Sequence, residues 1–270
     1  VSIFDISKEN LTKAEANISK NLDRMIKKEK ISELDKKNIL SRITFLNEIE
    51  ENIEDSDLVV EAATERKDVK FNIFQKLDKI CKPETILASN TSSISITEIG
   101  SKTNREEKVI GMHFMNPVPI MKLVEVIKGK KTSNKTFETI MDLSKQLDKT
   151  PVFVNDAPGF VANRILMPMI NEAILTLEQN ISGVEEIDTV MILGMSHPMG
   201  PLFLADFIGL DVCLSILNVM HEGFQDEKYV ACNLLKQMVN NNELGVKTGK
   251  GFYDYSEGLK NKKVSPNFLK

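Results

Sequence analysis

The sequence has no tryptophan and only three histidines and three cysteines among its 270 residues. The cysteines, Cys81, Cys213 and Cys232, are odd in number and no two have CxxC spacing, which argues against a disulfide framework and a zinc site. No metal is therefore expected. No apolar run reaches the ~18 residues of a membrane span, and no secretory signal pattern is visible. These absences are typical of a cytoplasmic protein without membrane contact.

Basic charge is not in excess either. Lys and Arg number 35 and Asp and Glu 39, which gives a net charge of −4. Domains that bind nucleic acid usually carry a basic surface, so no nucleic-acid partner is expected. Hydrophobic residues make up 41% of the chain and charged residues 27%, as in ordinary globular proteins. The length allows one large domain or two ordinary ones.

The first half alternates strand and helix patterns. The opening "VSIFD" predicts a strand and is followed by a helical pattern, and "SRITFL", "DLVVEAATE", "ETILASNTSS" and "KVIGMHF" predict further strands. A helix is expected over 67–82. The run "DLVVEA" lacks polar alternation, as expected for a strand covered on both faces. This rhythm predicts an α/β domain over 1–155 with a doubly wound, Rossmann-type sheet.

The second half has a different, helical pattern from Asp156 onward. "NDAPGFVANRILMPMINEAILTLEQ" predicts a long helix with a kink at Pro168. Three further segments, 185–195, 200–220 and 228–239, each predict a helix. We therefore expect an all-α domain over 156–270.

Several polar residues follow the predicted strands of the first half. Asp5, Glu65 and His113 each stand at or just after such a strand, and "SNTSS" follows another. Ligands of open α/β sheets bind at the carboxyl ends of the strands. "GMHFMNPVPIMKLVEVI" predicts two strands around a proline-bounded turn, which places Glu125 on the strand after His113.

Five blocks in chain order carry a family resemblance: "SNTSSISITEI", "GMHFMNPVPIMKLVEVI", "APGFVANRILMPMINEA", "SHPMGPLFLADFIGLD" and "KTGKGFYDY". Together they resemble the L-3-hydroxyacyl-CoA dehydrogenase family, with the bacterial 3-hydroxybutyryl-CoA dehydrogenases as the most similar branch. The resemblance covers nearly the whole chain. It implies reversible NAD(P)-dependent oxidation of (S)-3-hydroxybutyryl-CoA to acetoacetyl-CoA.

The resemblance implies that His113 and Glu125 form the catalytic dyad. Histidine suits proton transfer from a secondary alcohol because its unperturbed pKa, about 6.5, lies near working pH. A carboxylate beside it fixes the ring and stabilises the imidazolium. Without the resemblance, the alternative is a core histidine bonded to a backbone carbonyl, with Glu125 on a solvated face.

Family positions at the substrate fall on Ser92 and Asn163, whose hydroxyl and amide can bind the 3-oxygen and polarise it. Asn116, three residues after His113, is a further polar candidate. From the residues alone, turn capping by Ser92 and a capping or buried bond of Asn163 remain open.

The cofactor positions are only partly present. The resemblance places Asp5 at the adenosine ribose, Glu65 and Lys70 near the nicotinamide ribose and phosphates, and Asn90 at another NAD contact. An acid at position 5 favours NAD over NADP, with NADP left open. The family's first strand and G-x-G-x-x-G turn would precede Val1, so the α/β domain is expected to be N-terminally incomplete. Weak NADH binding and two unpaired strand edges inside the sheet are expected consequences.

The helix after Asp5 carries a basic face formed by Lys20, Arg24, Lys27 and Lys28, with Ile18, Leu22 and Met25 expected on the opposite face. The resemblance makes Lys28 the best match for a contact with coenzyme A. A remote anchor of this kind helps to position C3 for transfer. A solvated basic face is the alternative.

Two other functions stay open. One is a non-catalytic remnant of the fold, and the other is a sugar-acid dehydrogenase of the same superfamily, which would not need a distant phosphate clamp. The resemblance implies a homodimer or higher homo-oligomer through the helical domain, and the apolar residues over 201–220 are compatible with that. His197 and His221 are expected to be structural.

Overall fold

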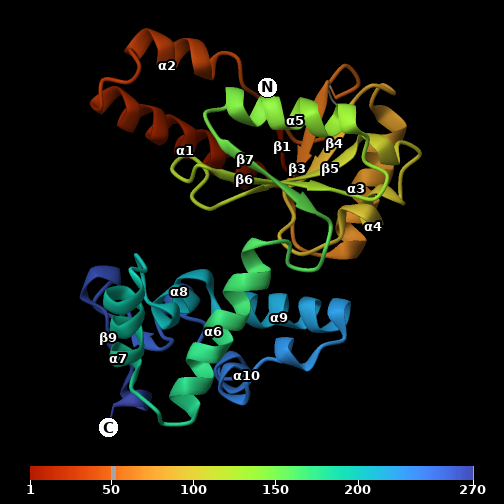
Figure 1. Ribbon diagram of the computed structural model, residues 1–270. Coiled ribbons are helices and arrows are strands. Elements are labelled where there is room, and N and C mark those ends of the chain that lie inside the picture. Colours follow the sequence, from red (N-terminus) through yellow and green to blue (C-terminus); the bar gives the residue numbers. More distant parts are fainter. Residues whose placement is uncertain (50–52, 270) are drawn as a thin grey trace.

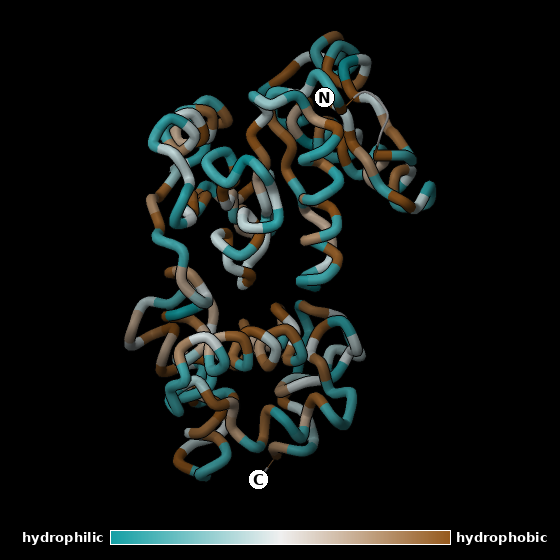
Figure 2. The backbone as a smooth tube through the Cα atoms, turned by 90° about the vertical axis from the view of Figure 1, so that its right-hand side faces the viewer, coloured by the Kyte–Doolittle hydropathy of each residue, from teal (hydrophilic) through white to brown (hydrophobic). Residues whose placement is uncertain are grey.

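A computed structural model describes residues 1–49 and 53–269 and shows two units, one above the other (Figure 1). Figure 2 shows the same two lobes from the side, with the N-terminus in one and the C-terminus in the other. The elements of the first unit are β1 (Ser2–Phe4), α1 (Lys8–Lys27), α2 (Glu33–Leu40), β2 (Thr44–Leu46), β3 (Leu58–Glu61), α3 (Lys67–Ile80), β4 (Ile86–Ser89), α4 (Ile96–Gly100), η1 (Glu106–Lys108), β5 (Val109–Phe114), β6 (Leu123–Lys128), α5 (Asn134–Gln146) and β7 (Thr150–Asn155).

The main sheet has the order β3-β4-β5-β6-β7 and is parallel except for the antiparallel pair β5–β6. Helices cover both of its faces. Val109 packs in a cluster with residues of α3 and α4, whereas its neighbour Ile110 packs in a cluster with Ile140 of α5. The expected doubly wound, Rossmann-type architecture is therefore confirmed.

A second, two-stranded sheet is formed by β1 and β2, which pair in parallel. Over the described ranges 1–49 and 53–269, β1 pairs only with β2 and β3 only with β4. This separation agrees with the expectation of two unpaired strand edges in the α/β unit.

Helices α1 and α2 form a hairpin that extends away from the sheet (Figure 1). In α1 the buried residues are Leu11 and Leu22. Met25, expected on the face opposite the basic residues, has a 38% exposed side chain. The sequence reasoning also missed α2, whose start is marked by a capping box between Ser32 and Asp35.

The helical unit packs around one core that includes Met167, Leu202, Leu217 and Leu235, all fully buried. By itself, no described helix is long and apolar enough to cross a membrane, although α8 and α9 pass that test as a bent pair. Its elements are α6 (Ala162–Glu178), α7 (Val184–Thr189), the π-helical η2 (Val190–Gly194), α8 (Pro201–Ile208), α9 (Leu210–Phe224), η3 (Glu227–Tyr229), α10 (Asn233–Asn240), η4 (Val246–Thr248), β8 (Tyr253–Asp254), η5 (Leu259–Asn261), β9 (Lys263–Val264) and η6 (Pro266–Phe268).

Two helix predictions in this unit were wrong in detail. Segment 200–220 is not one helix but two, α8 and α9, which meet at 95°. Gly209 between them has φ 105°, a backbone conformation that glycine adopts far more readily than other residues. Segment 228–239 is helical only from Asn233, after the short η3 turn.

Candidate active site

His113 and Glu125 face each other across the β5–β6 hairpin. The antiparallel register pairs them directly, and His113 Nδ1 lies 2.7 Å from Glu125 Oε2. Their side chains are 11% and 3% exposed. A carboxylate at this distance fixes the ring orientation and favours Nε2 as the atom that exchanges a proton with a ligand.

The other oxygen of Glu125 reaches the helical unit. Oε1 accepts hydrogen bonds from the amides of Val161 and Ala162 at the start of α6, at 3.1 and 2.9 Å. Burial opposes ionisation of Glu125, but the His113 contact and these amides outweigh it and hold its pKa below the usual range. The carboxylate is therefore ionised at neutral pH beside the imidazole.

Ser92 and Asn163 come together from opposite units. Asn163 Nδ2 donates to the backbone carbonyl of Ser92 at 3.0 Å. Ser92 Oγ donates to Glu65 Oε1 at 3.1 Å. Asn163 lies in the first turn of α6, close to the amides that bind Glu125. The same helix start therefore contacts both the dyad and the loop that carries Ser92.

Three other predicted substrate and cofactor residues, Asn90, Asn116 and Asp5, differ in their hydrogen bonds and exposure. Asn90 Oδ1 accepts from the amide of Phe114 at 2.9 Å, next to His113. Asn116 is exposed in the turn between β5 and β6. Asp5 is half-buried after β1 and accepts from the amide of Ser7 at 2.7 Å.

Glu65 and Lys70 are part of a network that contains an acid missed by sequence reasoning. Lys70 is 1% exposed, and its ammonium bonds to Glu61 at 2.7 and 3.0 Å. Burial opposes ionisation of Glu65, but hydrogen bonds from Thr91 and the Lys70 charge lower its pKa overall. The available signal was an acid at the end of the apolar run "DLVVEA", with a lysine nine residues later.

The predicted basic face of α1 is open to solvent. Lys20, Arg24, Lys27 and Lys28 are exposed. Among the described residues, no acid forms a salt bridge with any of these four. Their positive charge therefore remains available to an anionic ligand.

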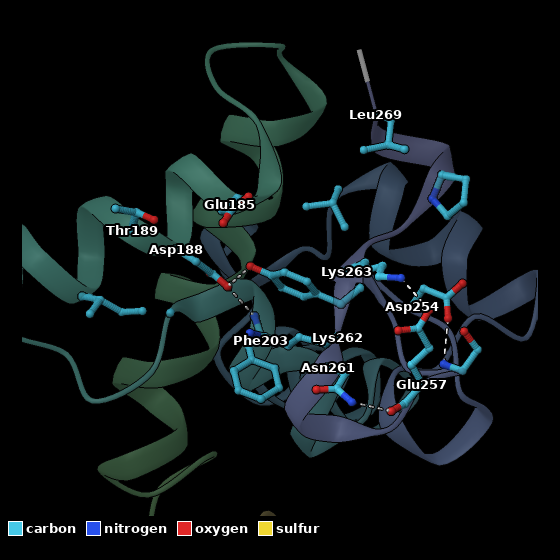
Figure 3. A pocket seen from close by; sticks show the side chains of 16 residues that line it. Glu185, Asp188, Thr189, Phe203, Asp254, Glu257, Asn261, Lys262, Lys263 and Leu269 are labelled. Atoms are coloured by element: carbon cyan, nitrogen blue, oxygen red, sulfur yellow. Dashed lines mark hydrogen bonds and ion pairs between the residues drawn. The ribbon is translucent and has the colours of Figure 1, made fainter.

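A cavity of about 800 Å³ lies in the helical unit, between α7 and the C-terminal segment (Figure 3). At its wall, Asp188 accepts from the amides of Leu202 and Phe203 and from the Tyr253 hydroxyl at 2.8, 3.0 and 2.8 Å. None of the predicted catalytic or cofactor residues lines this cavity. The Asp188 carboxylate is therefore already paired within the protein.

Comparison with known proteins agrees with this geometry. Residues 1–157 match the NAD binding domain of 3-hydroxyacyl-CoA dehydrogenase, and residues 159–255 match its C-terminal domain. A probable 3-hydroxybutyryl-CoA dehydrogenase of Bacillus subtilis is 52% identical over 95% of this chain and 89% of its own length. The human mitochondrial hydroxyacyl-coenzyme A dehydrogenase is 41% identical over 94% of this chain and 83% of its own length.

Solved structures give the same result. The (S)-3-hydroxybutyryl-CoA dehydrogenase of Ralstonia eutropha has a TM-score of 0.91 and 48% identity, and covers 95% of this chain and 90% of its own. Both units are therefore matched, in sequence and in fold, by proteins of one kind. The chain belongs to the 3-hydroxyacyl-CoA dehydrogenase family.

Proposed function

We propose that this chain catalyses the reversible NAD-dependent oxidation of (S)-3-hydroxybutyryl-CoA to acetoacetyl-CoA. The observation that carries the proposal is the buried His113–Glu125 pair, with a 2.7 Å contact, at the end of β5 and against the start of α6. The relatives named as 3-hydroxybutyryl-CoA dehydrogenases support this substrate over a sugar acid.

His113 acts as the general base in this proposal. It takes the proton of the 3-hydroxyl at Nε2, and Glu125 stabilises the imidazolium that forms. Burial of the pair excludes water and strengthens this electrostatic effect. In the reverse direction, the imidazolium returns the proton to the 3-oxygen.

Ser92 and Asn163 stand at the substrate oxygen in this proposal. The Ser92 hydroxyl donates to Glu65 at 3.1 Å, and by turning it would donate instead to the 3-oxygen, whose own hydrogen is shared with His113. Asn163 holds the loop through the Ser92 carbonyl. Asn116 is exposed and is available to the thioester end of the substrate.

The residues present fit the ribose and nicotinamide parts of a dinucleotide. Asp5, Glu65 and Asn90 follow β1, β3 and β4, at the carboxyl ends of strands, where such cofactors bind. Asp5 would accept from the adenosine ribose hydroxyls and repel a 2′-phosphate, which favours NAD over NADP. Lys70 is 1% exposed, so it would act on the nicotinamide side through its neighbour Glu65. NAD, when bound, supplies the acceptor for the hydride from C3.

Lys28 would bind a phosphate of coenzyme A, together with the exposed basic residues before it. We assign this substrate anchor and the cofactor to an α/β domain over 1–155. A helical domain over 156–270 would form the opposite side of the substrate site. A cytoplasmic location fits this role.

The decisive experiment is an assay of NADH absorbance with acetoacetyl-CoA, compared with a sugar acid and NAD, in a form of the protein that carries a G-x-G-x-x-G turn before Val1. Oxidation of NADH by acetoacetyl-CoA alone is the expected result. Turnover with the sugar acid and not with acetoacetyl-CoA would identify the protein as a sugar-acid dehydrogenase. No turnover with either substrate would favour a non-catalytic role.

Self-association is part of the proposal. The apolar residues of segment 201–220 mostly fill the core of the helical unit. Exposed apolar side chains gather instead on and beside η2, where Val190, Leu193 and Met195 are 60, 79 and 61% exposed. A homodimer or higher homo-oligomer would cover them. Light scattering should show a smaller particle for Leu193→Glu, and an unchanged mass would argue against this face.

A further inference from the structure

Glu61, Lys70 and Glu65 form a chain of charges behind the loop that carries Ser92. Lys70 Nζ lies 2.7 and 3.0 Å from the two oxygens of Glu61 and 3.4 Å from Glu65 Oε2. The side chains of Lys70 and Glu61 are only 1% and 2% exposed. A buried ammonium without a carboxylate partner is strongly destabilising, so Glu61 is what keeps the Lys70 charge in this place.

Glu65 in turn accepts hydrogen bonds from the loop that carries Ser92. Its Oε1 accepts from the Thr91 hydroxyl at 2.6 Å, the Ser92 and Ser93 amides at 2.8 and 3.0 Å, and both serine hydroxyls at 3.1 and 3.0 Å. Its Oε2 is turned toward Lys70. The ammonium therefore sets the orientation of the carboxylate that holds Ser92.

Glu61 also reaches the beginning of the same loop. Its Oε2 accepts from the Ser89 hydroxyl at 2.6 Å, and its carbonyl accepts from the Asn90 amide at 2.7 Å. Its Oε1 accepts from the Ala63 amide at 2.6 Å. One acid thus fixes the loop directly at Ser89 and Asn90, and fixes it at Ser92 through Lys70 and Glu65.

We propose that Glu61 is a positioning residue for the reaction, which holds the loop at Ser92 in place through Lys70 and Glu65. Glu61 lies behind the loop and has no contact with substrate in this arrangement. The inference rests on the proposed function, because the position of Ser92 matters only if the 3-oxygen of the substrate binds there.

The first test measures the loop without any activity. Glu61→Gln keeps the shape of the side chain and removes its charge, so amide hydrogen exchange at Ser92 and Ser93 should accelerate roughly tenfold or more. Asp78→Asn is the matched control, because it breaks the buried Arg105–Asp78 pair, 2.7 Å long, at the other end of α3. Unchanged exchange in Glu61→Gln would overturn the proposal.

The second test separates positioning from folding. In Glu61→Gln, kcat with acetoacetyl-CoA should fall roughly 10–100-fold, as expected when a reacting group is displaced slightly, while the KM for NADH stays unchanged. Asp78→Asn should lose stability and keep its kcat. The double variant Glu61→Gln/Lys70→Met removes both charges, so it should regain stability but not kcat.

Two kinetic outcomes would contradict different proposals. Full kcat with a raised KM for NADH in Glu61→Gln would mean that Lys70 serves the cofactor alone, and would overturn the proposal. An inactive parent enzyme would contradict the proposed function instead. In that case the exchange measurement would still decide whether Glu61 holds the loop.

Discussion

At the scale of single residues, the dyad is defined by two interactions of one carboxylate. Glu125 Oε2 contacts His113, and Oε1 accepts two amides of the helical unit. A carboxylate fixed on both oxygens cannot rotate away from the imidazole. The geometry therefore favours a histidine held in one orientation, which is what repeated proton transfer to a bound alcohol requires.

In a form of the protein that carries the G-x-G-x-x-G turn, His113→Gln should lower turnover with acetoacetyl-CoA by ~10²–10⁴, the usual contribution of a positioned acid–base group. Steady-state kinetics of NADH oxidation measure the effect. His221→Gln is the control, because His221 lies on α9 with a 39% exposed side chain and should keep full turnover. Near-normal turnover of the His113 variant would remove this residue from the mechanism.

Lys28→Ala should raise the KM for acetoacetyl-CoA more than the KM for the corresponding pantetheine thioester, which lacks the distant phosphates. The difference should shrink as salt concentration rises, because exposed charges are screened. Lys236→Ala, on α10 of the other unit, serves as the control. Equal and salt-insensitive effects on both substrates would leave Lys28 as an ordinary surface lysine.

At the scale of elements, the bend between α8 and α9 depends on one backbone conformation. A Cβ at Gly209 would lie 3.1 Å from Asp211 Oδ1 and 3.2 Å from Lys247 Nζ, at a φ of +105°. Gly209→Ala should therefore destabilise the protein by about 1–3 kcal/mol, measured by urea unfolding. A Cβ at Gly100 would come no closer than 3.5 Å to Val109, which is ordinary contact, so Gly100→Ala should have little effect. Equal stability of the two variants would contradict this account.

This bend also shows what the sequence could not predict. The apolar pattern continues on both sides of Gly209, so it predicts one helix, whereas packing of the two halves selects the bend. The β5–β6 hairpin was predictable because alternation, prolines and strand length all act locally. The Glu61–Lys70 pair was missed because an acid after a strand is usually solvated, and only the packing of α3 on β3 buries it. The Asn163–Ser92 bond spans 71 residues and depends on how the two units meet.

At the scale of the whole molecule, the C-terminal segment is held to the helical unit by buried carboxylates. Asp206 of α8 is 1% exposed. It accepts from the amides of Phe252 and Tyr253 at 3.1 and 3.0 Å and from the Tyr255 hydroxyl at 2.8 Å. Burial raises the pKa of Asp206 to about 6, against hydrogen bonds that lower it, and nearby Asp188 raises it further. Packing of the C-terminal segment against α8 is therefore linked to the protonation of Asp206.

The sign of this linkage sets a prediction for stability against pH. Because the pKa of Asp206 in the folded state lies above its unfolded value of 3.8, the folded protein binds more protons between about pH 4 and 6, and the contribution of Asp206 to stability falls as pH rises through that window. Other groups, such as Glu65 and Glu125, have lowered pKa values and act in the opposite direction.

The parent protein must therefore be compared with Asp206→Asn, because the contributions of Glu65 and Glu125 are the same in both proteins and cancel in the difference. The free energy of unfolding should be higher in the parent protein than in Asp206→Asn, and this difference should shrink by about 1 kcal/mol between pH 5 and pH 7. Urea unfolding of both proteins at the two pH values measures it. A difference that stays constant or grows with pH would show that Asp206 is ionised throughout, held so by its three donors.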